Sequence, residues 1–513
     1  MEQEQHTEQS RPNHTFWIAL ALNLIFFLPI LVADRYISED LGRSAEGYTK
    51  WIDGGRPLSE ALMRLAALGT PFIDISPLPQ IAALIAYAAI PVLLVRRFRF
   101  KNPLPVVLAA FPIAANPFTL WNIARKFDAM PMAVSVLIFL LPISRGIPKT
   151  WKSWAADVGL LVCGLCFYQP SLNIYLVFVV FELVCEQRNG MDPVEFLKLG
   201  FVRASSVIAA IVIYRPISAF TVQGDYPKMA GELALGVKDL PLVLHNLYVD
   251  WDFLLNSLTR EFKSLFIVVI LVGVLLIIVC QIRYFRQKSV MGRLSSKPVV
   301  RLVVLVSGAF LPVLWILAST GFLIFLRYLS PPTSYLFIGT GALFSSAAFL
   351  VLLELATWKV DARLQAAVLA VLAYPLLMFS AVYGNALKEQ KQYEARIGSR
   401  LALDLQKLLS RQPIQLVVVD GKVGFAPTVE HVAKRFRLVR NVVEIQLAGG
   451  GNSGFFREVL RYFGVIKPTV ALDAATGLGF DAKTATPDVA APNYDLYCQN
   501  DKVFVLFKSL SEK

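Results

Sequence analysis

The sequence predicts an α-helical polytopic membrane protein, with about eleven transmembrane helices and a small C-terminal α/β domain. The membrane part follows from composition, because 56% of the 513 residues are hydrophobic and only 17% are charged. In a typical soluble domain about 45–50% of the residues are apolar and about 25% are charged. The second part follows from a change of pattern, because long apolar runs stop near residue 383. We therefore expect a transmembrane domain over 1–383 and a separate domain over 384–513.

Eleven apolar segments are the expected membrane spans. A helix that crosses about 30 Å of hydrocarbon needs about 20 mainly apolar residues. Segments 130–144 and 172–187 are short for this purpose, and FYQPSLN at 167–173 predicts a break between two helices. The expected spans are 16–33, 78–95, 104–122, 130–144, 155–170, 172–187, 203–220, 264–282, 302–326, 335–354 and 365–383.

The C-terminal part combines two kinds of pattern. IQLVVVDGK at 414–422 and KVFVLFK at 502–508 have strand composition, whereas 427–439 and 454–464 have helical spacing. We expect a small α/β domain on the outer side of the membrane, because an odd number of spans carries the chain across. Acceptor recognition and a simple spacer both remain open as its role.

The basic residues predict the orientation. The formal net charge is +13, and in membrane proteins excess Lys and Arg collect in cytoplasmic loops. This rule places 34–77, 123–129, 168–172, 221–263 and 327–334 on the periplasmic side. No Gly-rich phosphate loop and no interleaving of aromatic with basic residues is present, so nucleic acid is not an expected partner. The loops with the strongest basic character are 96–101, 145–152 and 283–301.

The first outer loop carries an unusual group of charges: Asp34, Glu39, Asp40 and Arg43 follow the first span closely. They could be interfacial anchors beside an amphipathic helix that lies at the membrane surface. They could also be catalytic, because a carboxylate near a low-dielectric region can accept a proton from a sugar hydroxyl.

Arginine in the same loop suits an anionic ligand. Arg35, Arg43, Arg56 and Arg64 all lie on the side where the positive-inside rule disfavours them. They need either paired carboxylates or an anionic ligand, and guanidinium groups bind phosphate by two parallel hydrogen bonds. A carboxylate base together with phosphate-binding arginines is what transfer from a lipid-phosphate sugar requires.

Three further segments on the same predicted side supply candidates. In NPFTLWNIARKFDAMPM at 116–132, Arg125 and Asp128 would position a substrate, although Asn-Pro and Met-Pro could simply end helices. Gln169 and Asn173 could bind sugar hydroxyls or satisfy the backbone of a broken helix.

Arg327 and Tyr328 form the last candidate pair, either as an interfacial anchor or as a clamp on a donor phosphate. No metal-ligating or nucleotide-binding motif is apparent, which disfavours a soluble nucleotide-sugar donor.

Three motifs stand out: EDLGRSAEGYTKWIDGGRPLSEALMRLAALGTPFIDISPLPQ, ANPFTLWNIARKFDAMPMAV and FYQPSLNIYL. Together they resemble the bacterial Gtr type-II glucosyltransferases, the serotype-converting enzymes of O-antigen. The resemblance covers roughly residues 16 to 383 and is strongest in the first 180. In the family motif two acids precede an arginine. Here Glu39 and Asp40 precede Arg43, and Glu39 replaces the aspartate that is common in the family.

The resemblance implies a GT-C-type enzyme of the bacterial inner membrane with its active site facing the periplasm. It implies an inverting transfer of glucose from undecaprenyl-phosphate-glucose to an O-antigen sugar of lipopolysaccharide, served by a separate donor synthase and flippase. On this basis Asp40 is the expected general base, assisted by Glu39 or Asp34. Arg43 and Arg327 are expected to bind the donor phosphate.

No cofactor is implied with certainty, because some GT-C enzymes need a divalent cation such as Mg²⁺ or Mn²⁺ and others do not. The alternative function is a transporter or flippase of polyprenyl-linked sugars or lipids. That class more often places its polar residues near the bilayer midplane than at its edge.

Overall fold

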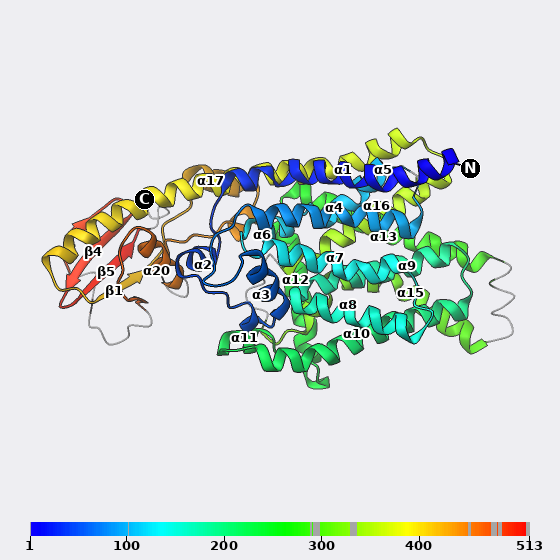
Figure 1. The fold of residues 1–513 in the computed structure, drawn as a ribbon, viewed down its shortest axis with the longest axis horizontal. Helices are drawn as coiled ribbons and strands as arrows, with labels where there is room; N and C mark the ends of the chain where they lie inside the picture. The colour runs from blue at the N-terminus through cyan, green and yellow to red at the C-terminus, as the bar shows by residue number, and fades with distance from the viewer. Residues whose placement is uncertain are drawn as a thin grey trace.

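The computed structural model describes residues 2–100, 102–287, 290, 298–328, 336–449, 453–472, 480 and 485–508. A bundle of roughly parallel helices forms the larger part of the molecule, and a small sheet with its helices lies beyond one end of it (Figure 1). The bundle helices are α1 (Glu2–Ala33), α4 (Leu78–Phe98), α5 (Pro103–Ala114), α6 (Pro117–Ala124), α7 (Ala129–Arg145), α8 (Trp151–Phe167), α9 (Leu172–Arg188), α10 (Pro193–Thr221), α13 (Arg260–Arg286), α15 (Pro298–Thr320), α16 (Gly339–Thr357) and α17 (Ala362–Arg411).

The predicted class is confirmed, with fewer full-length spans than the eleven expected. Among the described residues, eight helices are long and apolar enough to cross a membrane, or up to nine if one bent pair is a single span. That pair is α5 and α6, which meet at an angle of 67° inside the expected span 104–122. The expected spans 130–144 and 155–170 form α7 and α8, which have 17 residues each. The predicted break at 167–173 is confirmed by η2 (Gln169–Ser171).

Short elements collect at the end of the bundle that faces the sheet, and the N-terminus lies at the opposite end (Figure 1). The expected outer loop 34–77 thus shares one end of the molecule with the C-terminal region, as does much of 221–263. Most of the expected loop 327–334 lies outside the described residues. The short elements are α2 (Asp40–Glu46), η1 (Ile52–Gly54), α3 (Pro57–Ala66), α11 (Asp225–Ala230), η3 (Val237–Asp239), α12 (Leu240–Ser257) and η4 (Gly321–Phe325).

The C-terminal region contains a mixed five-stranded sheet in the order β2-β1-β5-β4-β3. β1 runs parallel to β2 and β5, whereas β4 is antiparallel to both of its neighbours. Both predicted strands are confirmed, as β1 and β5. The elements are β1 (Leu416–Asp420), α18 (Pro427–Arg435), α19 (Leu438–Val442), α20 (Ser453–Tyr462), β2 (Thr469–Ala471), β3 (Val489–Ala490), β4 (Tyr494–Gln499) and β5 (Lys502–Phe507).

Helix α17 joins the two parts. Its 50 residues span about 75 Å at about 1.5 Å per residue, and it runs from the bundle to the sheet (Figure 1). It passes residue 383 without a break, so the division into two domains at that point stays a prediction.

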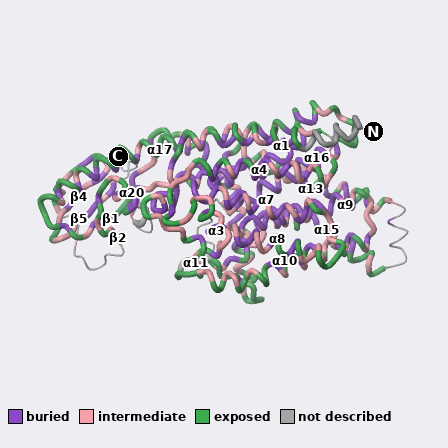
Figure 2. Tube along the Cα trace, viewed as in Figure 1, coloured by how far each residue is buried: buried purple, intermediate pink, exposed green. Residues whose placement is uncertain are grey.

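The distribution of buried side chains fits a bundle that lies in lipid. Buried residues concentrate inside the bundle, whereas the outer helices carry exposed residues along their length (Figure 2). Many exposed side chains on these helices are large and apolar, such as Val212 on α10 and Leu271 on α13, which are 64% and 61% exposed. Lipid tails are as apolar as these side chains, so exposure to the bilayer carries no hydrophobic cost.

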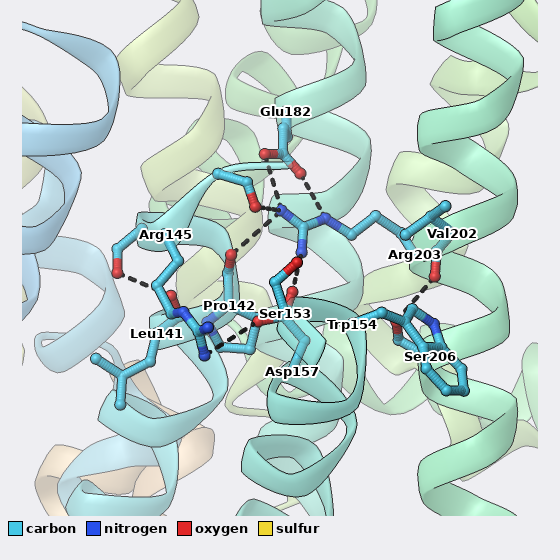
Figure 3. Close-up of polar contacts among 12 residues, drawn as sticks. Leu141, Pro142, Arg145, Ser153, Trp154, Asp157, Glu182, Val202, Arg203 and Ser206 are labelled. Atoms are coloured by element: carbon cyan, nitrogen blue, oxygen red, sulfur yellow. Dashed lines mark hydrogen bonds and ion pairs between the residues drawn. The ribbon is translucent and has the colours of Figure 1, made fainter. Parts of the chain in front are cut away.

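A buried ionic network ties four helices together away from the sheet (Figure 3). The Arg203 side chain on α10 is fully buried, and its Nε donates to Glu182 Oε2 of α9 at 2.8 Å. Its other nitrogens donate to Asp157 of α8 and to the carbonyls of Pro142 and Gly146 at the end of α7. Because every group of this guanidinium has a partner, the network fastens α7, α8, α9 and α10 to one another.

Candidate functional site

Asp40 begins α2 and lies where the first outer loop meets the chain between α6 and α7. Its side chain is buried, being 1% exposed. Oδ2 accepts hydrogen bonds from the backbone N–H groups of Lys126 at 2.9 Å and Ile37 at 3.3 Å. Within the described part of the chain both bonds end on Oδ2, which leaves Oδ1 able to take a proton.

The surroundings of Asp40 change its acidity. Burial raises its pKa to about 7 and the negative charge of Asp128 contributes, while Arg43 and the Lys126 N–H act in the opposite direction. A carboxyl group with a pKa near neutrality suits proton transfer at physiological pH.

Arg43 and Asp128 form a buried ion pair beside this carboxyl. Arg43 is one turn along α2 from Asp40, and its Nη1 lies 3.3 Å from Asp128 Oδ2. The guanidinium also pairs with Glu39 at 2.6 Å and lies over the Trp51 ring, 4.2 Å from the ring centroid. Trp51 Nε1 in turn donates a hydrogen bond to Asp128 Oδ1. The first outer loop and the start of α7 are therefore joined by charge, stacking and hydrogen bonding.

Asp128 stays ionised because several arginines surround it. Burial acts to raise its pKa, but Arg43, Arg125 and Arg56 together hold the pKa well below its usual range. Arg125 Nη1 lies 3.4 Å from Asp128 Oδ2, and Arg56 stacks on Tyr168 at 4.9 Å from the ring centroid. Arg56 forms no ion pair with the described residues, and its buried Nε has no hydrogen-bond partner among them.

A cavity of about 270 Å³ lies next to this cluster, between the end of α1, the start of α4 and the end of α6. Its polar lining comes from Asp34, Arg35, Ser76, Gln80 and Lys126. Lys126 Nζ pairs with Asp34 at 2.5 Å, and the Gln80 side chain is buried with no hydrogen-bond partner for its Oε1 among the described residues. Asp40 does not line this cavity itself. Lys126 links the two, because its side chain lines the cavity and its backbone binds Asp40.

Asp34 differs from Asp40 in both exposure and acidity. Its side chain is 60% exposed, and it pairs with Lys391 as well as with Lys126. Partial burial acts to raise its pKa, but the hydrogen bonds and charges of the two lysines lower it below the usual value. It is therefore a weaker base than Asp40.

The C-terminal region fastens the loop that precedes Asp40. Glu444 accepts hydrogen bonds from the backbone N–H of Ser38 at 2.6 Å and from its hydroxyl at 2.5 Å. Arg35 donates to the Glu444 carbonyl and pairs with Glu394 of α17 at 2.7 Å. Gln446 Nε2 donates to the carbonyl of Tyr36 at 2.7 Å. Residues 444–446 thus hold the backbone on which Asp40 is placed.

Four predicted site residues lie outside this cluster. Gln169 Nε2 donates to the Tyr214 hydroxyl at 2.6 Å and lies within 3.3 Å of the Gly54 carbonyl, so it braces the turn before Arg56. Asn173 donates to the Thr320 carbonyl at 3.1 Å and accepts from Phe322 N–H at 3.3 Å. It satisfies the backbone where α15 ends rather than at the break between α8 and α9, so a role of Gln169 and Asn173 in sugar binding stays a prediction.

Arg327 and Tyr328 also lie elsewhere. Arg327 pairs with Glu232 at 2.9 Å and with Asp239 at 3.2 Å. Tyr328 is 51% exposed. The pairing of Arg327 with two acids from the 221–263 segment gives it a structural role that its position in the sequence did not suggest.

The arginines on the disfavoured side are largely explained by paired carboxylates. Arg35 pairs with Glu394, Arg43 with Asp128 and Glu39, and Arg64 with Glu60. Arg56 is the exception within the described residues. It is therefore the arginine of this loop most available to an anionic ligand.

Several residues of the site carried no sequence signal. Glu444, Glu394 and Lys391 are 350 or more residues away from the loop that they contact. No local spacing could have indicated them, and covariation between homologues is the kind of signal that finds such pairs. Among the described residues no group of three His, Cys, Asp or Glu side chains could hold a metal ion.

The chain is similar in sequence to known proteins. A family model described as glucosyl transferase GtrII matches residues 28–346. An uncharacterized 55.3 kDa protein in the gtrB 5′ region of Salmonella phage P22 is 30% identical over 217 residues, which are 41% of this chain and 43% of that protein. No solved structure matches the chain.

Proposed function

The chain belongs to the glucosyl transferase GtrII family, and from this we propose that it transfers glucose from undecaprenyl-phosphate-glucose to an O-antigen sugar at the periplasmic face of the inner membrane. The observation that carries the proposal is the buried cluster of Asp40, Asp128, Arg43 and Arg125 at one end of the membrane bundle. It unites a carboxyl of near-neutral pKa with guanidinium groups, and Lys126 connects Asp40 to a neighbouring cavity.

Asp40 acts as the general base in this proposal. An acceptor hydroxyl oxygen attacks the anomeric carbon of glucose from the face opposite the phosphate, and the bond from that carbon to the phosphate oxygen breaks. The hydroxyl proton passes to Asp40 Oδ1, and the bonding electrons leave with the lipid phosphate. The configuration at the anomeric carbon is inverted as a result.

Arginine side chains stabilise the leaving phosphate. Arg56 has no anionic partner among the described residues, and Arg43 and Arg125 share Asp128 between them. Arg56, which forms no ion pair with the described residues, therefore supplies positive charge for the negative charge that develops on the phosphate. Arg327 is paired with Glu232 and Asp239. We therefore assign to Arg56 the binding of the donor phosphate that was expected of Arg327.

The cavity beside Asp34 and Lys126 is the proposed place of the sugar. Its volume of about 270 Å³ suits one hexose ring with its hydroxyls. The unpartnered Gln80 amide oxygen and the Asp34–Lys126 pair supply acceptors and a donor for those hydroxyls. Asp34 and Glu39 assist binding rather than proton transfer.

Asp40→Asn tests the assignment directly. With purified protein, undecaprenyl-phosphate-glucose and an O-antigen acceptor, this variant should lose at least about a thousandfold in transfer rate, since general-base catalysis contributes up to about 10⁴-fold. Asp53→Asn lies in the same loop, and the Asp53 side chain forms no hydrogen bond or ion pair with the described residues, so this variant serves as the matched control. Transfer near the wild-type rate in Asp40→Asn removes Asp40 from the mechanism, and loss in Asp34→Asn alone makes Asp34 the base.

Product analysis in the same assay separates transfer from transport. An enzyme forms a new glycosidic bond in detergent solution, where there is no second compartment. A transporter of polyprenyl-linked sugars forms none under these conditions.

A further inference from the structure

A second polar cleft lies apart from the acidic cluster, between α12 and the C-terminal helices α18 and α19. Its volume is about 610 Å³. Asp252, Asn256 and Ser257 line it from α12, and Lys434, Arg437 and Arg440 line it from the other wall. We name this space the basic cleft.

The basic cleft has an excess of positive charge. Three of its lining residues are cationic and one, Asp252, is acidic. Arg440 pairs with Glu430, and Asp252 accepts a hydrogen bond from Asn256 at 2.7 Å. The side chains of Lys434 and Arg437 are exposed and form no ion pair or hydrogen bond with the described residues, so two cations without a carboxylate partner line one cleft. An anionic ligand is what this arrangement fits.

The position of the basic cleft relates it to the membrane. Ser257 ends α12, and the membrane helix α13 begins three residues later at Arg260. At this junction Phe262 of α13 packs against Phe436 of the opposite wall, with ring centroids 6.1 Å apart. Farther along α13, Val268 and Leu271 are 53% and 61% exposed on the outside of the bundle. An anionic head in the cleft can therefore belong to a molecule whose apolar chain lies along α13 in the bilayer.

The basic cleft is also connected to the loop of Asp40. Asn441 bridges its two walls by donating to Ser257 Oγ at 3.0 Å. The next residue, Val442, accepts a hydrogen bond from Tyr383 of α17 at 3.1 Å, and Glu444 binds Ser38. One short segment thus forms a wall of the cleft and holds the catalytic loop.

We propose that the basic cleft binds the phosphate or pyrophosphate headgroup of a polyisoprenoid lipid, through Lys434 and Arg437, with the lipid chain lying along α13. The choice of an isoprenoid lipid rests on the proposed function, which requires membrane-bound substrates. A monophosphate would come from the sugar donor, and a pyrophosphate from a lipid-linked acceptor. Arg43, Arg56 and Arg125 near Asp40 then hold the reacting phosphate, and the basic cleft holds the second lipid or the released carrier.

Direct binding in nanodiscs tests this proposal. The probes are farnesyl phosphate, farnesyl pyrophosphate, uncharged farnesol and inorganic phosphate. The test variant is the double substitution Lys434→Gln with Arg437→Gln. The control is Lys407→Gln with Arg411→Gln, which removes the same charge from exposed positions of α17 in the same region of the protein.

The test variant should bind farnesyl phosphate or farnesyl pyrophosphate at least about tenfold more weakly than wild type and control, a loss of about 1.4 kcal/mol. Which of the two probes loses affinity identifies donor or acceptor as the source. Equal affinity of all three proteins for both charged probes overturns the proposal. Inorganic phosphate that competes as well as the charged lipids assigns the cleft to a soluble anion and also overturns it.

Failure of this inference and failure of the proposed function give different results. Binding is measured without any transfer step. Cleft-dependent lipid binding in a wild-type protein that transfers no glucose leaves the lipid site in place and removes the enzyme assignment. Glucose transfer by the wild-type protein without cleft-dependent lipid binding keeps the enzyme assignment and removes the lipid site.

Discussion

At the scale of single residues, two neighbouring acids are made different by their surroundings. Asp40 is buried and keeps a pKa of about 7, whereas Asp128 is buried among arginines and has a lowered pKa. One carboxyl can therefore exchange a proton near neutral pH while the other remains a fixed negative charge. This separation of two carboxyls by environment is the arrangement that general-base catalysis needs.

The expected pH dependence of transfer follows from the pKa of Asp40. The base must be deprotonated, so kcat/KM should fall about tenfold for each pH unit below about 7 and level off above it. Initial rates between pH 5 and 9 with purified enzyme measure this profile. In Asp53→Asn the profile should be unchanged, and a wild-type profile that stays flat down to pH 5 contradicts the assignment.

At the scale of elements, the loop that contains Asp40 depends on partners from distant parts of the chain. Residues 35–38 are held by Glu394 of α17 and by residues 444–446. The α5–α6 bend brings Lys126 to Asp40, and the start of α7 brings Asp128 to Arg43. The bent pair is thus more than an incomplete span, because the chain that follows it forms one side of the site.

Glu444→Gln tests the role of the C-terminal region as a positioning element. A carboxamide keeps one acceptor oxygen and loses the second bond to Ser38, so kcat should fall about tenfold while KM for the donor changes little. Steady-state kinetics of Glu444→Gln, Glu444→Asp and wild type provide the measurement. Glu389→Gln on the exposed side of α17 is the control, and the idea fails if Glu444→Gln matches it or if Glu444→Asp restores nothing.

The Arg203 network should contribute to stability rather than to transfer. Arg203→Met leaves the Glu182 and Asp157 carboxylates with fewer partners in a buried position, although Arg97 still pairs with Glu182. Breaking a buried pair on one side costs about 3–5 kcal/mol. Thermal unfolding in detergent should show a clearly lower midpoint for this variant, with no shift in Lys198→Met on the exposed side of the same helix. An unchanged midpoint refutes the structural role.

At the scale of the whole molecule, the site occupies the end of the membrane bundle that faces the C-terminal sheet (Figure 1). The short elements that follow α1 and precede α13 lie there together, and α17 extends the bundle towards the sheet. The basic residues at the opposite end of the bundle predict that this opposite end faces the cytoplasm.

Cysteine labelling tests this orientation. In a Cys498→Ser background, Ser410→Cys on the exposed end of α17 should react with a membrane-impermeant maleimide in intact spheroplasts. Lys152→Cys, at the start of α8, should react only after lysis. The reverse pattern would place the acidic cluster in the cytoplasm and exclude a periplasmic reaction.

The membrane class, the C-terminal strands and the loop that contains the acids could all be predicted from the sequence alone. Apolar runs and stretches of strand-forming residues depend on local composition, which can be read without a structure. The motifs around Asp40 and Asp128 likewise pointed to the two segments that meet.

Which charged residues pair with one another could be learned from the three-dimensional fold alone. The fold joined Arg43 to Asp128 and brought Glu444 to Ser38. It paired Arg327 with Glu232 rather than with Asp40 or Asp128. It also showed that an apolar run long enough for one span can fold as two helices at 67°. The physical reason is that ion pairs and hydrogen bonds act over a few ångströms in space. Their partners are set by how the helices pack, which the order of residues along the chain does not state.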